Sequence, residues 1–267
     1  MIARVQGEPS GPELVFVGTG EAVDPQLPNT SLLLRGPRTL LLDCGYAVPH
    51  AFWSISRDVE LLDAIWISHA HADHCFGLPA LLLWMRLGGR RRPLTLFGGP
   101  GSQARLSAVL ELGYPGSFAA HKCFAIEFVE LAPGEAARFG PLRLGVAATA
   151  HSLANYALRV EAPGQRSVVY SGDGAPTPES EALIAGVDVL VHECFFLAAK
   201  PEGARRHGAL DELLALASAA EVSCLAPLHF AAEAKAELRA AAQAGAAERG
   251  LGLFLAEVGD RLSLAPD

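Results

Sequence analysis

Residues 64–74 read Ala64-Ile65-Trp66-Ile67-Ser68-His69-Ala70-His71-Ala72-Asp73-His74. The first part is apolar and rich in β-branched and aromatic residues, which is typical of a buried strand. Potential metal ligands follow directly at His69, His71, Asp73 and His74, where this strand should end. Imidazole and carboxylate suit Zn²⁺ and also accept Mn²⁺, Fe²⁺ or Co²⁺. A histidine-rich surface loop is the alternative, but the density of ligands and their position favour a metal centre.

The alternation within this motif predicts two metal ions. His69 and His71 point the same way and can bind one ion, while Asp73 and His74 can face a second. A two-metal site needs further ligands, and His151, Asp173 and His229 each follow an apolar run that reads as a strand. Singly, a polar residue after a strand is usually a turn residue. Together with the first motif, these three are the predicted remaining ligands.

The rest of the chain alternates short apolar runs with helical segments, punctuated by Gly and Pro. Strands are predicted at residues 14–17, 31–34, 39–42, 64–67, 94–97, 125–129, 142–148, 156–161, 168–170, 187–191, 224–226, 252–256 and 261–264. Helices are predicted at residues 78–87, 102–112, 178–185, 210–220 and 231–248. Mixed sheets covered by helices, in two similar halves, favour an α/β fold of the αββα sandwich type, in a single domain over residues 1–267.

Composition sets limits on location and partners. Hydrophobic residues make up 51% of the 267 residues, but no run is long enough to span a membrane, and residues 1–9 do not resemble a signal peptide. The five cysteines are scattered without a Cys-x-x-Cys pair, so we expect a cytoplasmic protein with small buried thiols. The net charge of −8 disfavours a broad nucleic-acid interface. The basic run Arg86 with Arg90–Arg92 is either a solvated loop or a rim that steers anions.

These motifs, with others in collinear order, resemble the metallo-β-lactamase superfamily and in particular its ribonuclease Z-like branch. The further motifs are Gly18-Thr19-Gly20, Pro28-Asn29-Thr30-Ser31, Asp43-Cys44-Gly45, residues 76–82, residues 93–101, Ser171-Gly172-Asp173, residues 192–196 and His207-Gly208-Ala209. The resemblance implies a metallo-β-lactamase fold with two mixed β-sheets flanked by helices, and a homodimer. It also implies a two-metal hydrolase in which a hydroxide shared by the two ions attacks a phosphodiester.

The same resemblance assigns roles to individual residues. His69, His71 and His151 would bind one divalent ion, most simply Zn²⁺, and Asp73, His74 and His229 the other, with Asp173 bridging. Asp73, His207 and Glu193 are the predicted catalytic residues, with His207 stabilising a phosphoryl oxygen or protonating the leaving group and Glu193 orienting His207. His192 is predicted to be a buried structural histidine, and His50 and His121 to be surface residues.

Three departures from the branch bear on the substrate. Only 22 residues separate His151 from Asp173, so the arm with which family members hold transfer RNA is missing. Gly174 replaces a Thr, and Gly208-Ala209 replace Ser-Thr, which removes hydroxyl groups near the metals. The chain is acidic and carries no basic tail. These departures favour a small or flexible phosphodiester.

Other functions remain open from the sequence. One is a transfer-RNA 3′-processing endonuclease that docks RNA elsewhere, through Arg86 and Arg90–Arg92. Another is a sulfatase or other ester hydrolase, since a two-metal centre does not inherently distinguish sulfur from phosphorus. A non-catalytic metal-binding scaffold is the third, although degenerate relatives normally lose ligands and this chain retains the full set.

Overall fold

The computed structural model describes residues 11–201 and 206–266. Its first sheet has the order β14-β1-β2-β3-β4-β5-β6. The strands are β1 (Glu13–Gly18), β2 (Ser31–Arg35), β3 (Leu40–Leu42), β4 (Ala64–Ile67), β5 (Leu94–Gly98), β6 (Ile126–Glu130) and β14 (Arg261–Ser263). Strands β1, β2 and β3, all three predicted from the sequence, form an antiparallel meander, and β3 to β6 run parallel.

The second sheet has the order β13-β12-β11-β10-β9-β8-β7. The strands are β7 (Ala136–Phe139), β8 (Leu142–Thr149), β9 (Asn155–Glu161), β10 (Val168–Tyr170), β11 (Val189–Glu193), β12 (Cys224–Leu228) and β13 (Gly252–Leu253). Strands β7 to β10 are antiparallel, whereas β10 to β13 are parallel. Both sheets are therefore mixed.

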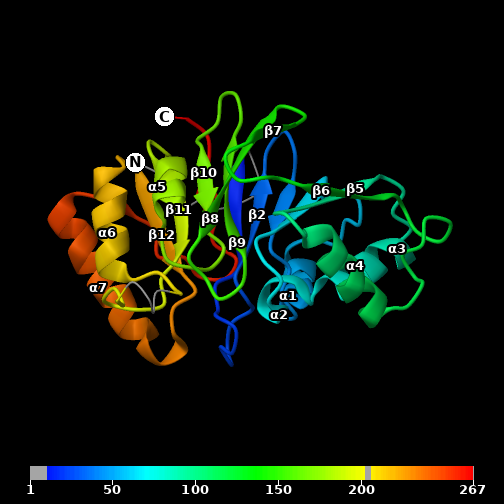
Figure 1. Ribbon diagram of the computed structural model, residues 1–267, viewed down its shortest axis with the longest axis horizontal. Coiled ribbons are helices and arrows are strands. Elements are labelled where there is room, and N and C mark those ends of the chain that lie inside the picture. The colour runs from blue at the N-terminus through cyan, green and yellow to red at the C-terminus, as the bar shows by residue number, and fades with distance from the viewer. Residues whose placement is uncertain (1–10, 202–205, 267) are drawn as a thin grey trace.

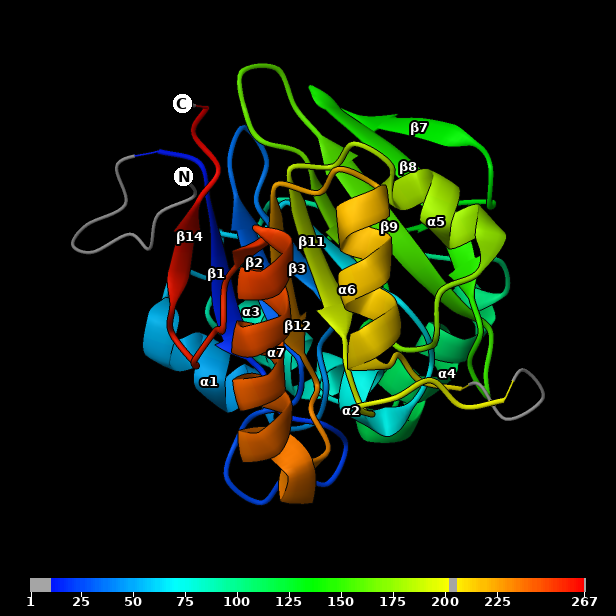
Figure 2. The same cartoon turned by 90° about the vertical axis from the view of Figure 1, so that its left-hand side faces the viewer.

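Helices cover the outer face of each sheet (Figures 1 and 2). The first sheet carries α1 (Val48–Ile55), α2 (Ala72–Cys75), α3 (Leu78–Leu87) and α4 (Ser102–Gly113). The second carries α5 (Pro178–Ile184), α6 (Leu210–Ala219) and α7 (Lys235–Arg249), the last preceded by a 3₁₀ turn at Ala232–Ala234. This arrangement confirms the predicted α/β sandwich of two mixed sheets flanked by helices.

Strand β4 shows why the apolar runs have no polar face. Trp66 belongs to the hydrophobic cluster between the two sheets, while Ile65 and Ile67 belong to the cluster between the first sheet and its helices. A strand buried on both faces must be apolar at every position, because successive side chains point to opposite sides. A third cluster fills the space between the second sheet and α6 and α7.

The sequence did not predict α1, α2 or β7. Strand β7 has half-buried and exposed side chains and an Ala-Ala-Arg-Phe sequence of weak strand preference. It forms at the sheet edge because β8 pairs with it, from Ala136 opposite Gly145 to Phe139 opposite Leu142. The sequence also predicts a strand over residues 252–256, but the observed strand β13 is shorter and ends at Leu253.

Within the basic run, Arg90 is part of the scaffold, and Arg92 lies away from the ligand motif. The buried Arg90 donates to the carbonyl oxygens of Val59 at 2.8 Å and Leu62 at 2.7 Å. Arg92 pairs with Asp63, the residue before β4, whereas the ligand motif follows the other end of β4. The prediction that this run is either a solvated loop or an anion-steering rim is therefore wrong for Arg90.

The structure also bears on the predicted burial of cysteines and histidines and on the predicted absence of a membrane span. Four cysteines are buried as predicted, and Cys123 is intermediate. His192 is buried, and His50 and His121 are exposed. Within residues 11–201 and 206–266, none of the helices combines the length and apolar character that a membrane crossing needs. The prediction that residues 1–9 are not a signal peptide concerns residues outside those that the structure describes.

Replacing Arg90 should destabilise the fold without affecting the ligand motif. We expect Arg90→Ala to lower the free energy of unfolding by about 2–4 kcal/mol, because buried carbonyl oxygens lose a charged donor. The neighbouring exposed Arg91 is the matched control, and Arg91→Ala should stay within about 0.5 kcal/mol. Urea denaturation measures both. Equal unfolding midpoints for the two variants would contradict the structural role of Arg90.

Candidate metal centre

The structure brings all the predicted ligands together into two groups that share one residue. His69, His71, His151 and Asp173 form the first group, and Asp73, His74, Asp173 and His229 form the second. Within each group the potential ligand atoms lie within 4.8 Å of one another. Asp173 belongs to both groups, which is the position that a bridging carboxylate requires.

Strand ends place these ligands. His69 follows β4, and Asp173 and His229 follow β10 and β12, which run parallel to β11 between them. The carboxyl ends of parallel neighbours meet at one edge of a sheet, so residues distant in sequence converge there. Glu193, the last residue of β11, lies at the same edge. His151 follows β8, whose antiparallel pairing ends at Thr149 opposite Asn155.

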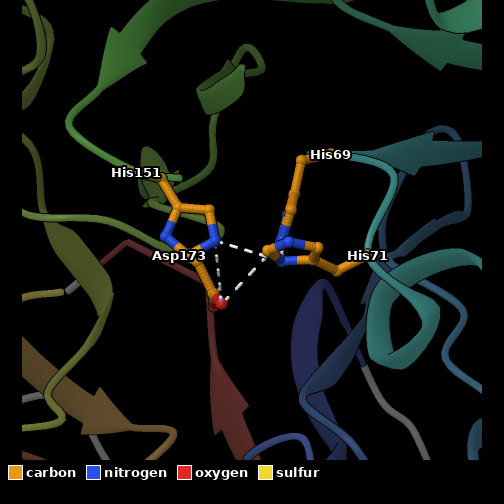
Figure 3. A group of neighbouring side chains, drawn as sticks. All are labelled: His69, His71, His151 and Asp173. Carbon is orange, nitrogen blue, oxygen red and sulfur yellow. Dashed lines mark hydrogen bonds and ion pairs between the residues drawn. The ribbon is translucent and has the colours of Figure 1, made fainter. Parts of the chain in front are cut away.

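The first group presents three imidazole nitrogens and one carboxylate (Figure 3). Nε2 of His69 lies 2.8 Å from Nδ1 of His71, and Nε2 of His151 lies 3.1 Å from the same atom. Oδ2 of Asp173 is 3.9 Å from Nε2 of both His69 and His151. Burial lowers the pKa of His69 well below its usual value and lowers that of His151. Both rings are therefore neutral near pH 7, which is the form that binds a metal.

The second group is more acidic and more deeply buried. Nε2 of His74 lies 3.2 Å from Oδ2 of Asp73 and 3.3 Å from Oδ1 of Asp173. Nδ1 of His229 is 3.5 Å from Oδ1 of Asp173. Burial acts against protonation of His74, but the carboxylates of Asp173 and Asp43 outweigh it and raise its pKa well above the usual value. Burial raises the pKa of Asp173, but His229 and His74 lower it overall well below its usual range.

The donor set fits divalent cations. Asp73 and Asp173 are 6% and 3% exposed, and in the described chain their ion pairs are with histidines alone. Buried carboxylates require compensation by a partner charge or a metal. Nε2 of His74 and Oδ1 of Asp173 are also buried without a hydrogen-bond partner. A cation between these atoms would satisfy both requirements.

Asp43, just after the meander, supports the centre from behind, a role that its motif in the sequence does not indicate. Its fully buried carboxylate accepts hydrogen bonds from Ser68 N at 2.7 Å and from Tyr170 Oη at 2.6 Å, and Oδ2 lies 2.7 Å from Nδ1 of His74. Such partners fix the tautomer and the orientation of a ligating histidine. Asp43 has φ 62° and His229 has φ 55°, conformations that residues other than glycine rarely adopt.

His207 lies at the rim of the centre and contacts Glu193. Nδ1 of His207 is 3.2 Å from Oε1 of Glu193, and its ring centroid lies 5.0 Å from that of His151 and 6.3 Å from that of His229. Burial disfavours the charged imidazole, but the contact with Glu193 dominates and raises the pKa of His207. The carbonyl oxygen of Arg206 lies 2.8 Å from Nδ1 of His151, so this segment also orients a predicted ligand.

The two glycines that depart from the family pattern hold Glu193. The backbone N–H groups of Gly174 and Gly208 both donate to Oε1 of Glu193 at 2.8 Å. Gly174 has φ 101°, and a Cβ there would lie 2.5 Å from Oγ1 of Thr149. A Cβ on Gly208 would lie 2.5 Å from the carbonyl oxygen of Glu193. Glycine at both positions therefore allows the backbone to approach this carboxylate closely.

The interval between His151 and Asp173 is occupied by a hairpin, whose two strands the sequence predicts at residues 156–161 and 168–170. Strands β9 and β10 pair antiparallel, and Gly164 in the connecting turn has φ 68°. This interval, all of it described, leaves no room for an inserted arm.

The sequence matches the family model described as Anti-Pycsar protein Apyc1 over residues 12–250. The chain belongs to this family. It is also 29% identical over 273 residues to Ribonuclease Z of Shouchella clausii, a match that covers 81% of this chain and 86% of the relative.

Solved structures share the fold. The metallo-β-lactamase fold protein YhfI of Bacillus subtilis superposes with a TM-score of 0.78 at 21% identity, covering 94% of this chain and 98% of the other. The short form of human tRNase Z superposes with a TM-score of 0.76 at 20% identity, covering 95% and 100%. The predicted resemblance to a ribonuclease Z-like protein of metallo-β-lactamase fold is thereby confirmed.

Asp43 provides a test of the ligand geometry. We expect Asp43→Asn to weaken Zn²⁺ binding by about 10–100-fold, because an amide cannot replace the carboxylate beside His74. Tyr170→Phe, which removes one donor to Asp43, should weaken it less. Competition with a chromophoric chelator measures the affinity.

The matched control is Asp63→Asn, because Asp63 is a supporting carboxylate at the opposite end of β4 that accepts from Thr39 N at 2.8 Å. Circular dichroism of the metal-free proteins establishes that the variants fold. Unchanged affinity in folded Asp43→Asn protein, or an equal loss in both aspartate variants, would contradict the supporting role.

Proposed function

We propose that the protein is a dinuclear metal-dependent phosphodiesterase acting on a small or flexible phosphodiester. The observation that carries the proposal is the arrangement of Asp173, which belongs to two adjoining groups of ligand atoms, with the partly exposed His207 beside them. The relatives named as ribonuclease Z and tRNase Z support a phosphoester substrate.

The proposed metal sites follow from the two groups. His69, His71 and His151 would hold one ion and Asp73, His74 and His229 the other, with Asp173 between them. When bound, two divalent ions neutralise charge on phosphoryl oxygens and lower the pKa of water. Zinc is the proposed metal because nitrogen ligands predominate in the first group, with Mn²⁺ and Fe²⁺ as alternatives.

His207 would act on the leaving group. Its side chain is 25% exposed, whereas those of His151 and His229 are 2% and 3% exposed. It is therefore the histidine of the three most open to a substrate. With Nδ1 directed at Glu193, its Nε2 is free to donate a proton or a hydrogen bond to a departing alkoxide.

Glu193 would act through His207. Its fully buried carboxylate accepts hydrogen bonds from two backbone N–H groups, and these fix its position independently of His207. A fixed acceptor at Nδ1 selects the His207 tautomer and favours its protonated form. We therefore propose Glu193 as a positioning residue.

The proposed substrate is small. The short β9–β10 hairpin and the scaffold role of Arg90 support a small substrate over a folded RNA. The cytoplasmic location, the homodimer and the single hydrolase domain remain predictions.

A substrate panel tests the reaction class. We expect the metal-loaded protein to hydrolyse bis(p-nitrophenyl) phosphate, to lose this activity on chelation and to regain it with Zn²⁺ or Mn²⁺. The same preparation is assayed on p-nitrophenyl sulfate, a lactone and a thioester. Hydrolysis of the lactone or thioester without the phosphodiester would refute the proposal, and metal stoichiometry near zero would favour a scaffold.

The second candidate, a transfer-RNA 3′-processing endonuclease, is favoured by the relatives named as ribonuclease Z. A precursor transfer RNA with a 3′ trailer distinguishes it from the first. We expect little or no cleavage, because the His151–Asp173 interval holds no RNA-binding arm. Efficient cleavage after the discriminator nucleotide would make this candidate the correct one.

The role of His207 predicts a dependence on the leaving group. We expect His207→Ala to lower kcat about 10²–10⁴-fold on a dinucleotide, whose alkoxide needs a proton, and much less on bis(p-nitrophenyl) phosphate. Glu193→Gln should show the same pattern with smaller losses. Glu161→Gln, at the far end of β9, serves as the matched control. Equal losses on both substrates would contradict proton donation.

A further inference from the structure

Asp173 lies on a backbone turn that neither a helix nor a strand fixes. It follows the end of β10 and stands between Gly172 with φ 58° and Gly174 with φ 101°. Glycine allows the widest choice of backbone conformations, so two glycines beside a ligand leave its position poorly determined by the local sequence. Contacts from elsewhere must therefore hold the Asp173 backbone so that its carboxylate faces His69 and His151 (Figure 3).

The buried carboxamide of Asn155 supplies such contacts. Its Oδ1 accepts from Asp173 N at 3.2 Å, and its Nδ2 donates to the carbonyl oxygen of Ser171 at 2.9 Å and to that of Asp173. Asn155 is 1% exposed, so water does not compete for these bonds. A Cβ on Gly172 would lie 2.5 Å from Oδ1 of Asn155, and glycine therefore lets the carboxamide approach the turn. One side chain thus binds both backbone polar groups of the residue that belongs to both ligand groups.

Thr149 joins this network to the strand that carries another predicted ligand. Its Oγ1 accepts from Nδ2 of Asn155 at 2.6 Å and donates to the carbonyl oxygen of Asp173 at 2.6 Å. Thr149 is the last residue of β8, pairs with Asn155 at the start of β9, and is followed two positions later by His151. The network therefore ties the carboxylate of Asp173 to the strand end that positions His151.

The residue after Asn155 connects the same segment to His69. Tyr156 N donates at 3.2 Å to the carbonyl oxygen of Ser68, which directly precedes His69. The Tyr156 ring packs against the turn between β5 and α4, where a Cβ on Gly99 would lie 2.1 Å from a ring carbon. The start of β9 therefore contacts the segments that carry three of the four ligands of the first group, namely His69, His151 and Asp173.

We propose that Asn155 is a positioning residue that holds Asp173 as the bridge between the two metal sites. This inference rests on the proposed function, because a bridge is required only where two ions are bound side by side. Two adjacent divalent cations repel each other, and a carboxylate between them offsets the repulsion by attracting both. Asn155 fixes this carboxylate before any ion binds.

Loss of Asn155 should affect the second ion more than the first. Apart from Asp173, each ligand group keeps three residues of its own, so either group can still bind a single ion. The second ion then meets the repulsion of the first without a fixed carboxylate to offset it. A weakened second step with a nearly unchanged first step is therefore the signature of the positioning role, whereas general destabilisation would weaken both steps.

Stepwise Zn²⁺ titration of the full-length protein tests this role. We expect Asn155→Ala to weaken binding of the second equivalent by about 10–100-fold and that of the first by less than about threefold. Thr149→Val, which keeps the shape of the side chain but removes its hydroxyl group, should cause a smaller loss of the same kind. Thr149→Ser should restore the affinity. Competition with a chromophoric chelator measures both steps, and the Thr149 pair keeps the test decisive if Asn155→Ala does not fold.

Electron paramagnetic resonance of the Mn²⁺-loaded protein reports the bridge directly. An isolated Mn²⁺ ion gives a resolved hyperfine spectrum, whereas two ions that share bridging ligands are spin-coupled. We expect a coupled spectrum from the wild-type protein and the spectrum of isolated ions from Asn155→Ala. Ser167→Ala is the matched control, because Ser167 Oγ donates to Asp188 at 2.6 Å and so links two segments at the other end of β10. It should lower the unfolding temperature but keep the coupled spectrum.

The outcomes separate the positioning role from the proposed reaction. Wild-type affinities and a coupled spectrum in the folded Asn155→Ala and Thr149→Val proteins would overturn the role and leave hydrolysis of bis(p-nitrophenyl) phosphate by the wild type unaffected. An equal change in Ser167→Ala would overturn it too, as would a wild-type protein that binds a single ion. If the variants lose the coupling but the wild type hydrolyses no phosphodiester, the role of Asn155 stands and the proposed function fails.

Discussion

The carboxylate of Asp173 is the contact on which the candidate centre depends. It lies within 3.9 Å of nitrogen atoms of His69, His74, His151 and His229, and it is almost completely buried. A charge in this position is costly unless the surroundings compensate it. The surrounding histidines compensate this charge. The strand ends and the contact with Asp43 hold these histidines so that the oxygen atoms of Asp173 stay available to cations.

Much of this arrangement could be predicted from the sequence because it is encoded locally. The run from Ala64 to His74 contains both the buried strand and the ligands that follow it, so one short stretch indicated the fold and half of each ligand group. His151, Asp173 and His229 were recognisable because each follows an apolar run. The αββα architecture followed from the alternation of such runs with helical segments.

What the sequence could not show depends on contacts between distant residues. Asp43 became important only when the fold placed it 2.7 Å from Nδ1 of His74, 31 positions later in the chain. Gly174 and Gly208 appeared to be losses of hydroxyl groups, yet both lie where a Cβ would collide and where the backbone N–H reaches Glu193. The charge of Arg90 predicts an exposed side chain, whereas in the structure several carbonyl oxygens accept its hydrogen bonds and make burial favourable. Strand β7 has little intrinsic preference and forms only through its pairing with β8.

Each ligand group takes two residues from each half of the chain. His69 and His71 follow the first sheet and join His151 and Asp173 from the second, while Asp73 and His74 join Asp173 and His229. Neither half alone contains a complete coordination set. A bound ion would therefore link the two layers of the sandwich. Full metal occupancy would then require that the two halves have packed correctly against each other. Metal binding at this centre is therefore coupled to folding, because an incompletely folded chain has no complete ligand group.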